Sequence, residues 1–168
     1  MKALDLIRWS LQFSQEATLS TVADLREHPF LRSSPGGKGG PGNHAIWTLG
    51  HLATLEGGVP NILIGESNPV ENWWPLFGMG TECKDDASLY PSFDVLVNTF
   101  RDLRSKNIRL LEQTGEAGLD RKPKNIPPGF EKEMETFGRT FQVIAMHNLM
   151  HCGQLTDMRR AAGFKPRF

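Results

Sequence analysis

Apolar residues recur at steps of three and four positions through four segments of the chain. These segments are residues 3–28, 44–64, 92–114 and 136–162. The third segment is the clearest case, because its apolar stripe begins at Phe93 and continues through Phe100 to Leu111. Side chains three and four residues apart share one face of an α-helix, so the pattern predicts four amphipathic helices.

Residues that begin, end or bend helices lie at the expected places in these segments. Asn43, Ser92 and Thr136 are the predicted N-caps, since their side chains can accept a hydrogen bond from a free amide of the first turn. Gly163 is predicted to end the last helix. Pro60, inside the second segment, is predicted to kink its helix.

Glycine and proline gather in the three stretches between the predicted helices. Residues 29–43 contain eight of them, and residues 65–91 and 115–135 contain six each. The run of glycines and prolines at residues 35–42 lacks the spacing of a phosphate-binding loop and is predicted to be a flexible connector. Such stretches are longer than the roughly 2–8 residues that join helices in a simple bundle. They therefore permit a crossover topology and could cover a site.

The fold class follows from these two patterns. No segment shows the two-residue alternation that is typical of a β-strand. The sequence therefore predicts an all-α protein, a four-helix bundle with long connectors. A length of 168 residues suits a single domain over residues 1–168.

Charge and composition narrow the choice of partners. The chain has 19 Lys plus Arg and 19 Asp plus Glu, so its formal net charge is zero, whereas a nucleic-acid binder usually has a basic excess. No apolar run approaches the ~20 residues of a membrane span, and the first residues do not resemble a signal peptide. Two cysteines do not make a disulfide framework. We therefore expect a cytoplasmic protein that binds neither nucleic acid nor membrane.

Three of the five histidines could form a metal site. His147 and His151 are four residues apart in the last predicted helix, and at that spacing two imidazoles can bind one ion. No glutamate follows the first of them, which excludes an H-E-x-x-H metalloprotease. His51 shares the inward face of the second helix with Trp47, so helix packing would direct His51 toward the pair. The alternative is a buried, hydrogen-bonded histidine beside a partly exposed one.

The other two histidines have simpler interpretations. His44 lies on the same face as His51 but about two turns earlier, roughly 10 Å along the helix axis, and is too far away to share an ion. His28 stands next to Pro29 at the predicted end of the first helix, where it could interact with the helix dipole.

Trp47, Trp73 and Gln154 are the candidate pocket residues. Gln154 could orient a bound water or make a hydrogen bond to a facing helix. Trp73, together with Trp74 and Phe77, could form a wall or lid over the metal, or could extend the core at the end of the bundle.

Neither cysteine is predicted to be a nucleophile. Cys152 follows its neighbouring histidine by about 100° of helix turn, which points it away from the ligand direction, so it is predicted to be a small core residue. Cys83 stands among acidic residues, which would raise the pKa of its thiol.

The motifs around the histidines resemble those of the DinB-like superfamily. Residues 47–52 contain a W-x-x-x-H motif and residues 147–154 contain H-x-x-x-H-x-G-Q, and the resemblance extends over nearly the whole chain. It implies a four-helix bundle in which His51, His147 and His151 hold a divalent metal ion. These are the same three residues that the helix faces indicate. Imidazole ligands suit Zn, Ni or Fe.

The activity that the resemblance implies is broader. Some DinB-like proteins are thiol-dependent S-transferases that use bacillithiol, mycothiol or glutathione, and one related branch isomerises maleylpyruvate. The implied function is a metal-dependent enzyme that activates water or a low-molecular-weight thiol toward a small-molecule substrate. The outer faces of the first and third helices could support a homodimer, as in many relatives. The alternative is a non-catalytic stress-response or binding protein with a structural metal.

Overall fold

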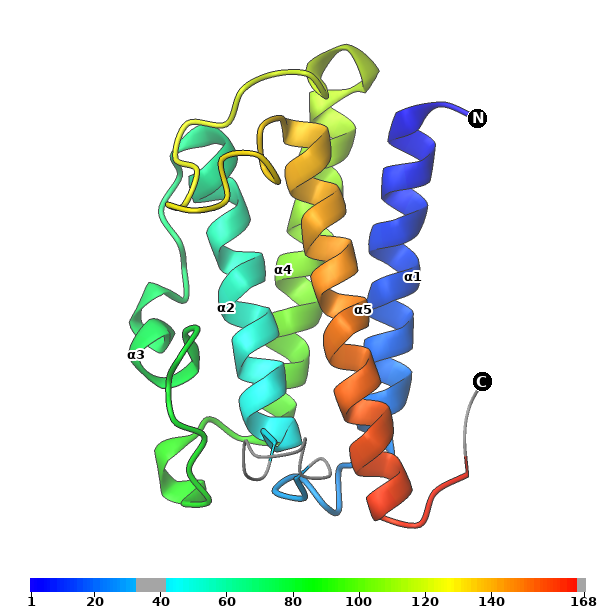
Figure 1. Ribbon diagram of the computed structural model, residues 1–168, viewed down its shortest axis with the longest axis vertical. Coiled ribbons are helices and arrows are strands. Elements are labelled where there is room, and N and C mark those ends of the chain that lie inside the picture. The colour runs from blue at the N-terminus through cyan, green and yellow to red at the C-terminus, as the bar shows by residue number, and fades with distance from the viewer. Residues whose placement is uncertain (33–41, 166–168) are drawn as a thin grey trace.

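The structure, a computed structural model, describes residues 1–32 and 42–165 of the chain. Four long helices lie side by side (Figure 1): α1 (Ala3–Ala23), α2 (Ala45–Ile64), α4 (Phe93–Thr114) and α5 (Phe137–Ala161). The described residues form no strand, only an isolated bridge between Arg32 and His44. The predicted all-α class is therefore confirmed. The tract predicted to be a flexible connector falls largely in residues 33–41, outside the described part of the chain.

Each long helix packs against two others. α1 contacts α5 and α4, and α2 contacts α4 and α5. α1 and α5 run in one direction, whereas α2 and α4 run in the opposite direction (Figure 1). The chain must therefore return along the molecule between α2 and α4. It does so outside α2, where it forms the short helices η2 (Glu71–Trp73) and α3 (Trp74–Phe77), followed by η3 (Ala87–Leu89).

The helices begin close to the predicted caps, with one correction. Ser92 accepts a hydrogen bond from the amide of Val95 at 3.3 Å, and Thr136 accepts one from Arg139 at 3.2 Å, as predicted. The N-cap of α2 is His44 and not Asn43, because Nδ1 of His44 accepts the hydrogen bond of the first turn. An imidazole with its hydrogen on Nε2 offers the same acceptor as an asparagine side chain.

The first helix ends earlier than its apolar pattern predicts. α1 stops at Ala23, and residues 24–27 continue as turns in which the amide of Leu25 donates to the carbonyl of Val22, three residues earlier. Leu25 is nonetheless fully buried, so it extends the apolar stripe without being helical. Pro29 disfavours helical geometry in the residue before it, which explains why the helix does not reach residue 28.

Pro60 does not interrupt α2, which continues to Ile64 and ends at Gly65. A proline cannot donate the hydrogen bond that would normally satisfy the carbonyl four residues earlier, here that of Glu56. The side chain of Asn107 on α4 donates to this carbonyl at 3.0 Å. A neighbouring helix therefore supplies the bond that Pro60 cannot make.

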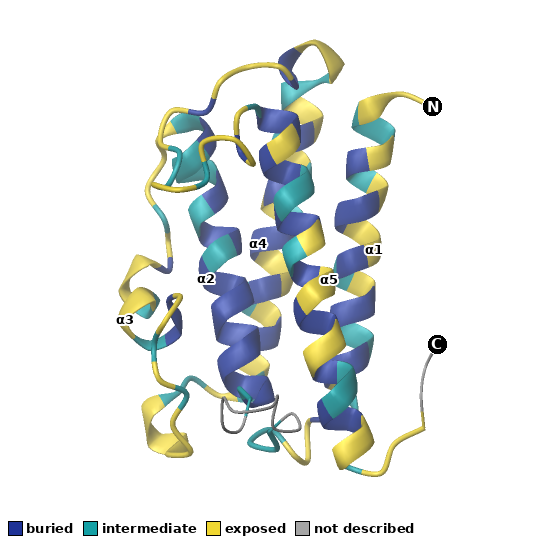
Figure 2. Ribbon diagram, in the orientation of Figure 1, coloured by how far each residue is buried: buried dark blue, intermediate teal, exposed yellow. Residues whose placement is uncertain are grey.

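Buried residues follow the inward sides of the four long helices, and α2 is buried over most of its length (Figure 2). The outer side of α1 exposes three large apolar side chains, Leu6, Trp9 and Phe13, with the last two rings stacked at 5.2 Å. On α4 only Val95 is comparably exposed among the large apolar residues that the structure describes. Within residues 1–32 and 42–165, no helix combines the length and apolarity needed to cross a membrane.

Candidate metal centre

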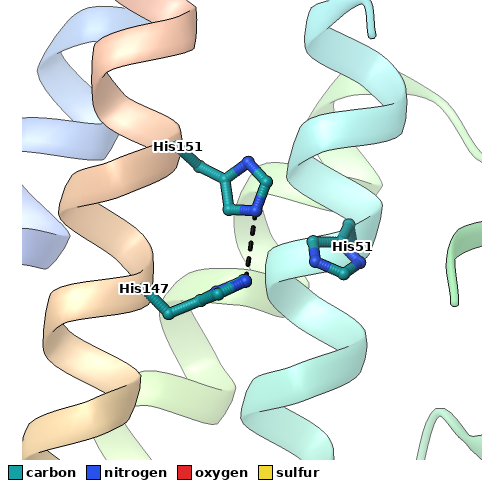
Figure 3. Close-up of side chains that lie close together, drawn as sticks. All are labelled: His51, His147 and His151. Carbon is teal, nitrogen blue, oxygen red and sulfur yellow. Dashed lines mark hydrogen bonds between the residues drawn. The ribbon is translucent and has the colours of Figure 1, made fainter. Parts of the chain in front are cut away.

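Three histidine side chains from two helices converge on one point (Figure 3). His51 comes from α2, and His147 and His151 come from α5. One ring nitrogen of each lies within 4.8 Å of those of the other two. His51 and His151 are buried, and His147 is half-buried. The structure thus brings together the three residues that the sequence indicates as a ligand set.

The spacing of the α5 pair suits a single ion. Nε2 of His147 lies 3.2 Å from Nε2 of His151. Two imidazole nitrogens on a tetrahedral zinc ion, each at about 2.0–2.1 Å, would lie roughly 3.3 Å apart. The ring centroid of His51 is 5.2 Å from that of His147 and 5.0 Å from that of His151, so the third ring faces both members of the pair.

His51 is held by the last residue of α3. Its Nδ1 lies 2.7 Å from the carbonyl oxygen of Phe77, so Nδ1 carries the hydrogen and Nε2 keeps a free lone pair. On α2, Trp47 stacks on the His51 ring at 4.9 Å with an interplanar angle of 11°, and its indole donates to the hydroxyl of Thr81 at 3.2 Å. Trp47 therefore covers one face of the His51 ring.

A glycine on α2 makes this arrangement possible. A Cβ at Gly50 would overlap the ring of Phe77, which is fully buried. Because Gly50 has no side chain, the Phe77 ring packs directly on the backbone of α2. This close approach brings the Phe77 carbonyl within reach of His51, one residue along the helix.

His151 is held within its own helix. Its Nδ1 donates to Oε1 of Gln154 at 2.8 Å, which again leaves Nε2 free. Gln154 was a candidate for orienting a bound water or for a hydrogen bond to a facing helix, and the structure gives it a different role. The two residues are three positions apart and share one helix face, so the bond forms within α5.

The ring of His147 differs from the other two in its hydrogen bonds. His51 and His151 both carry their hydrogen on Nδ1, so the 3.2 Å contact requires His147 to donate from Nε2. A metal ion at the point where the rings meet would take the place of that hydrogen. Among the described residues, Nδ1 of His147 has no hydrogen-bond partner.

Burial keeps the three rings neutral. It lowers the pKa of His51 and of His151, because the charged form loses its hydration. The pKa of His147 falls to about 3, first through burial and further through the neighbouring His151 and His51 rings. Neutral imidazole is the form that binds metals, so the site is in its ligand form at neutral pH.

The remaining histidines lie elsewhere. His44 is fully buried at the start of α2, where its Nε2 donates to the carbonyl of Lys84 at 2.8 Å. It takes no part in the cluster, as its distance along the helix predicts. His28 lies beyond the end of α1 against the ring of Phe164, so the predicted helix-dipole role is wrong.

Trp73 and the two cysteines pack on the core. Trp73 is half-buried and packs on the core, whereas Trp74 is 49% exposed. Cys152 is buried, with its sulfur 3.6 Å from the hydroxyl of Thr21, as expected for a core residue. Burial raises the pKa of the Cys83 thiol, and Asp85 adds to this more weakly, so the predicted direction holds.

Sequence reasoning missed a polar cluster next to the histidines. Glu56 of α2 and Arg104 of α4 form a fully buried ion pair, with 2.6 Å between Oε1 and Nη2. Asn107 and Asn148 both donate to the same carboxylate. A signal was present in the sequence, because Arg104 and Asn107 occupy the stripe that Phe100 and Leu111 define.

The donor set fits a first-row divalent metal. The three neutral nitrogen ligands converge, and two of them have their second nitrogen fixed by a protein oxygen, as is common for metal-binding histidines. Comparison with known protein families gives a match over most of the chain. The family model described as DinB superfamily matches residues 10–155. No protein with a curated description matches the chain.

Proposed function

The chain belongs to the DinB superfamily, and from that premise we propose that it binds a divalent metal ion through Nε2 of His51, His147 and His151. We further propose that it is a metal-dependent enzyme acting on a small molecule. The packing of α1, α2, α4 and α5 in two parallel pairs supports the four-helix bundle that the sequence predicts.

One observation carries the metal proposal. Each of the three histidines has a nitrogen directed at the same point, and the nitrogens of His51 and His151 that point away already have acceptors. Two buried histidines that served only the core would not need to share that point with a third. Three protein ligands with a position left open is the pattern of a catalytic zinc site, whereas structural sites are usually closed by four.

The chemistry follows from the charge of the ligands. An ion held by three neutral imidazoles would act as a Lewis acid and lower the pKa of a water or a thiol at its open position. The chain's own residues orient the site: Phe77 and Gln154 hold two rings, and Trp47 covers the face of the His51 ring. The low-molecular-weight thiol favoured here rests on the family, some of whose members transfer such thiols.

Metal content and activity test the proposal together. The wild-type protein should contain close to one equivalent of Zn, Ni or Fe, and a chelator should lower its melting temperature. A panel of low-molecular-weight thiols with an electrophilic acceptor should show turnover that His147→Ala abolishes. His28→Ala is the matched control, because His28 is an exposed histidine outside the cluster.

The results separate the two functions considered. Bound metal with thiol turnover that depends on His147 supports the enzyme. Bound metal without turnover of any thiol or ester in the panel would favour a binding protein with a structural ion. Purified protein that neither retains nor takes up a divalent metal would refute the site itself.

A further inference from the structure

A carboxylate on α2 connects all four long helices. Oε2 of Glu56 accepts hydrogen bonds from Nε of Arg104 at 3.0 Å and from Nδ2 of Asn107 at 2.8 Å, both on α4. The Arg104 guanidinium continues to α1, donating to the carbonyl of Leu11 at 2.7 Å and to the hydroxyl of Ser14 at 2.8 Å. Glu56, Arg104 and Ser14 are 0% exposed.

The link to α5 is made by Asn148, the residue after His147. Its Nδ2 donates to Oε1 of Glu56 and to the carbonyl of Ile144, both at 3.2 Å. Because both partners are acceptors, the orientation of the amide is fixed. Oδ1 is buried and has no hydrogen-bond partner among the described residues. Asn148 is 1% exposed, and its amide is directed at α2, the helix that carries His51.

Stability alone does not explain a polar cluster at this position. Taking a carboxylate and a guanidinium out of water costs about as much as their attraction returns, and well-packed apolar residues often serve a core equally well. Buried polar groups can instead fix the register of one helix on another, because a slipped arrangement leaves them unpaired. In this chain the bond between Glu56 and Asn148 joins the two helices that carry the histidines.

We propose that Asn148 is a positioning residue for the metal site: its hydrogen bond to Glu56 sets the register of α5 on α2 and so directs His147 toward His51. This proposal rests on the proposed function, that the three histidines hold an ion. A slip of one residue would shift α5 by about 1.5 Å and rotate it by roughly 100°. Metal–ligand distances tolerate only about 0.2 Å.

Two asparagines allow a matched test. Asn148 and Asn107 are both 1% exposed and both donate to Glu56, but Asn107 stands on α4, which carries no ligand. Asn148→Leu and Asn107→Leu therefore each remove one hydrogen bond to the Glu56 carboxylate. Asn107 also satisfies the carbonyl left free by Pro60, so its loss should destabilise the fold at least as much. For each variant we would measure the Zn²⁺ affinity by competition with a chelating dye, the visible spectrum of the Co²⁺ form, and urea unfolding without metal.

The proposal predicts different Zn²⁺ affinities for the two variants. Asn148→Leu should weaken Zn²⁺ binding about 10-fold and alter the Co²⁺ spectrum, as loss of an outer partner of a ligand does, while Asn107→Leu keeps wild-type affinity. Equal affinities in the two variants would overturn the positioning role and leave the metal site intact. Wild-type protein that binds neither ion would overturn both proposals. If Asn148→Leu does not fold, Asn148→Ser is measured in the same way, since it also cannot reach Glu56.

Discussion

Replacing Arg104 by methionine should destabilise the protein more than replacing both members of its ion pair. Methionine fills the space of the arginine stem but removes four hydrogen bonds, two of them to Glu56. The double variant Glu56→Leu/Arg104→Met removes the carboxylate as well. The order of stabilities is therefore predicted to be wild type, then the double variant, then the single variant.

The magnitudes follow from the partners that remain. In Arg104→Met the Glu56 carboxylate stays buried, with only the amides of Asn107 and Asn148 as donors. Leaving one member of a buried ion pair without the other costs about 3–5 kcal/mol. In the double variant no charge is left. Nδ2 of Asn107 still donates to the backbone carbonyl of residue 56, and Nδ2 of Asn148 still donates to that of Ile144. Because each amide nitrogen keeps an acceptor, the double variant should lose less than about 2 kcal/mol of unfolding free energy.

Urea unfolding of the metal-free proteins, followed by circular dichroism at neutral pH, measures these differences. A wild-type stability of about 5–15 kcal/mol leaves room to observe them. Recovery of about 2 kcal/mol in the double variant over the single would support the reasoning. A double variant as unstable as Arg104→Met would refute it, because the destabilisation could not then come from an unpaired buried charge.

Three further changes test other parts of the structure. Gly50→Ala should lose about 1–3 kcal/mol of unfolding free energy and some Zn²⁺ affinity, because its Cβ would overlap the buried ring of Phe77. The control Gly153→Ala, with no atom within 4 Å of the added Cβ, should match or exceed wild type in both measurements. Glu116→Ala should cost about 1 kcal/mol in urea unfolding, since its carboxylate accepts from the first two amides of α1 at 3.0 and 2.9 Å, whereas Glu112→Ala should not. The homodimer stays a prediction: light scattering should find a dimer that Trp9→Lys dissociates, and a wild-type monomer would contradict it.

Most of the helices were predictable, because the spacing of apolar residues and the capping residues can be recognised in the sequence. Ser92 and Thr136 begin α4 and α5 as predicted. The failures have local causes. A histidine that accepts through Nδ1 acts as the cap of α2, and an apolar stripe cannot distinguish a helix from the turn that carries Leu25 beyond α1. Periodicity records which side of the chain is buried and does not record the hydrogen-bond pattern.

The candidate site was also predictable only in part. His51, His147 and His151 were predictable as a group, since helix faces and spacing are sequence properties. The carbonyl of Phe77 that holds His51 was not, because every residue has a carbonyl and only the packing on Gly50 brings this one within 2.7 Å. Whether the three rings bind an ion stays a prediction.

The Glu56–Arg104 double variant also separates two roles that the buried cluster could have. If the cluster only stabilises the fold, a variant that regains stability should also regain Zn²⁺ affinity. If Asn148 positions α5 through Glu56, the double variant should fold well and still bind Zn²⁺ as weakly as Asn148→Leu, because both lack the same bond between α2 and α5. Stability and affinity would then move in opposite directions relative to Arg104→Met, in which that bond can still form. A cluster that serves the core alone cannot produce that result, since its effect on the metal site would pass through stability.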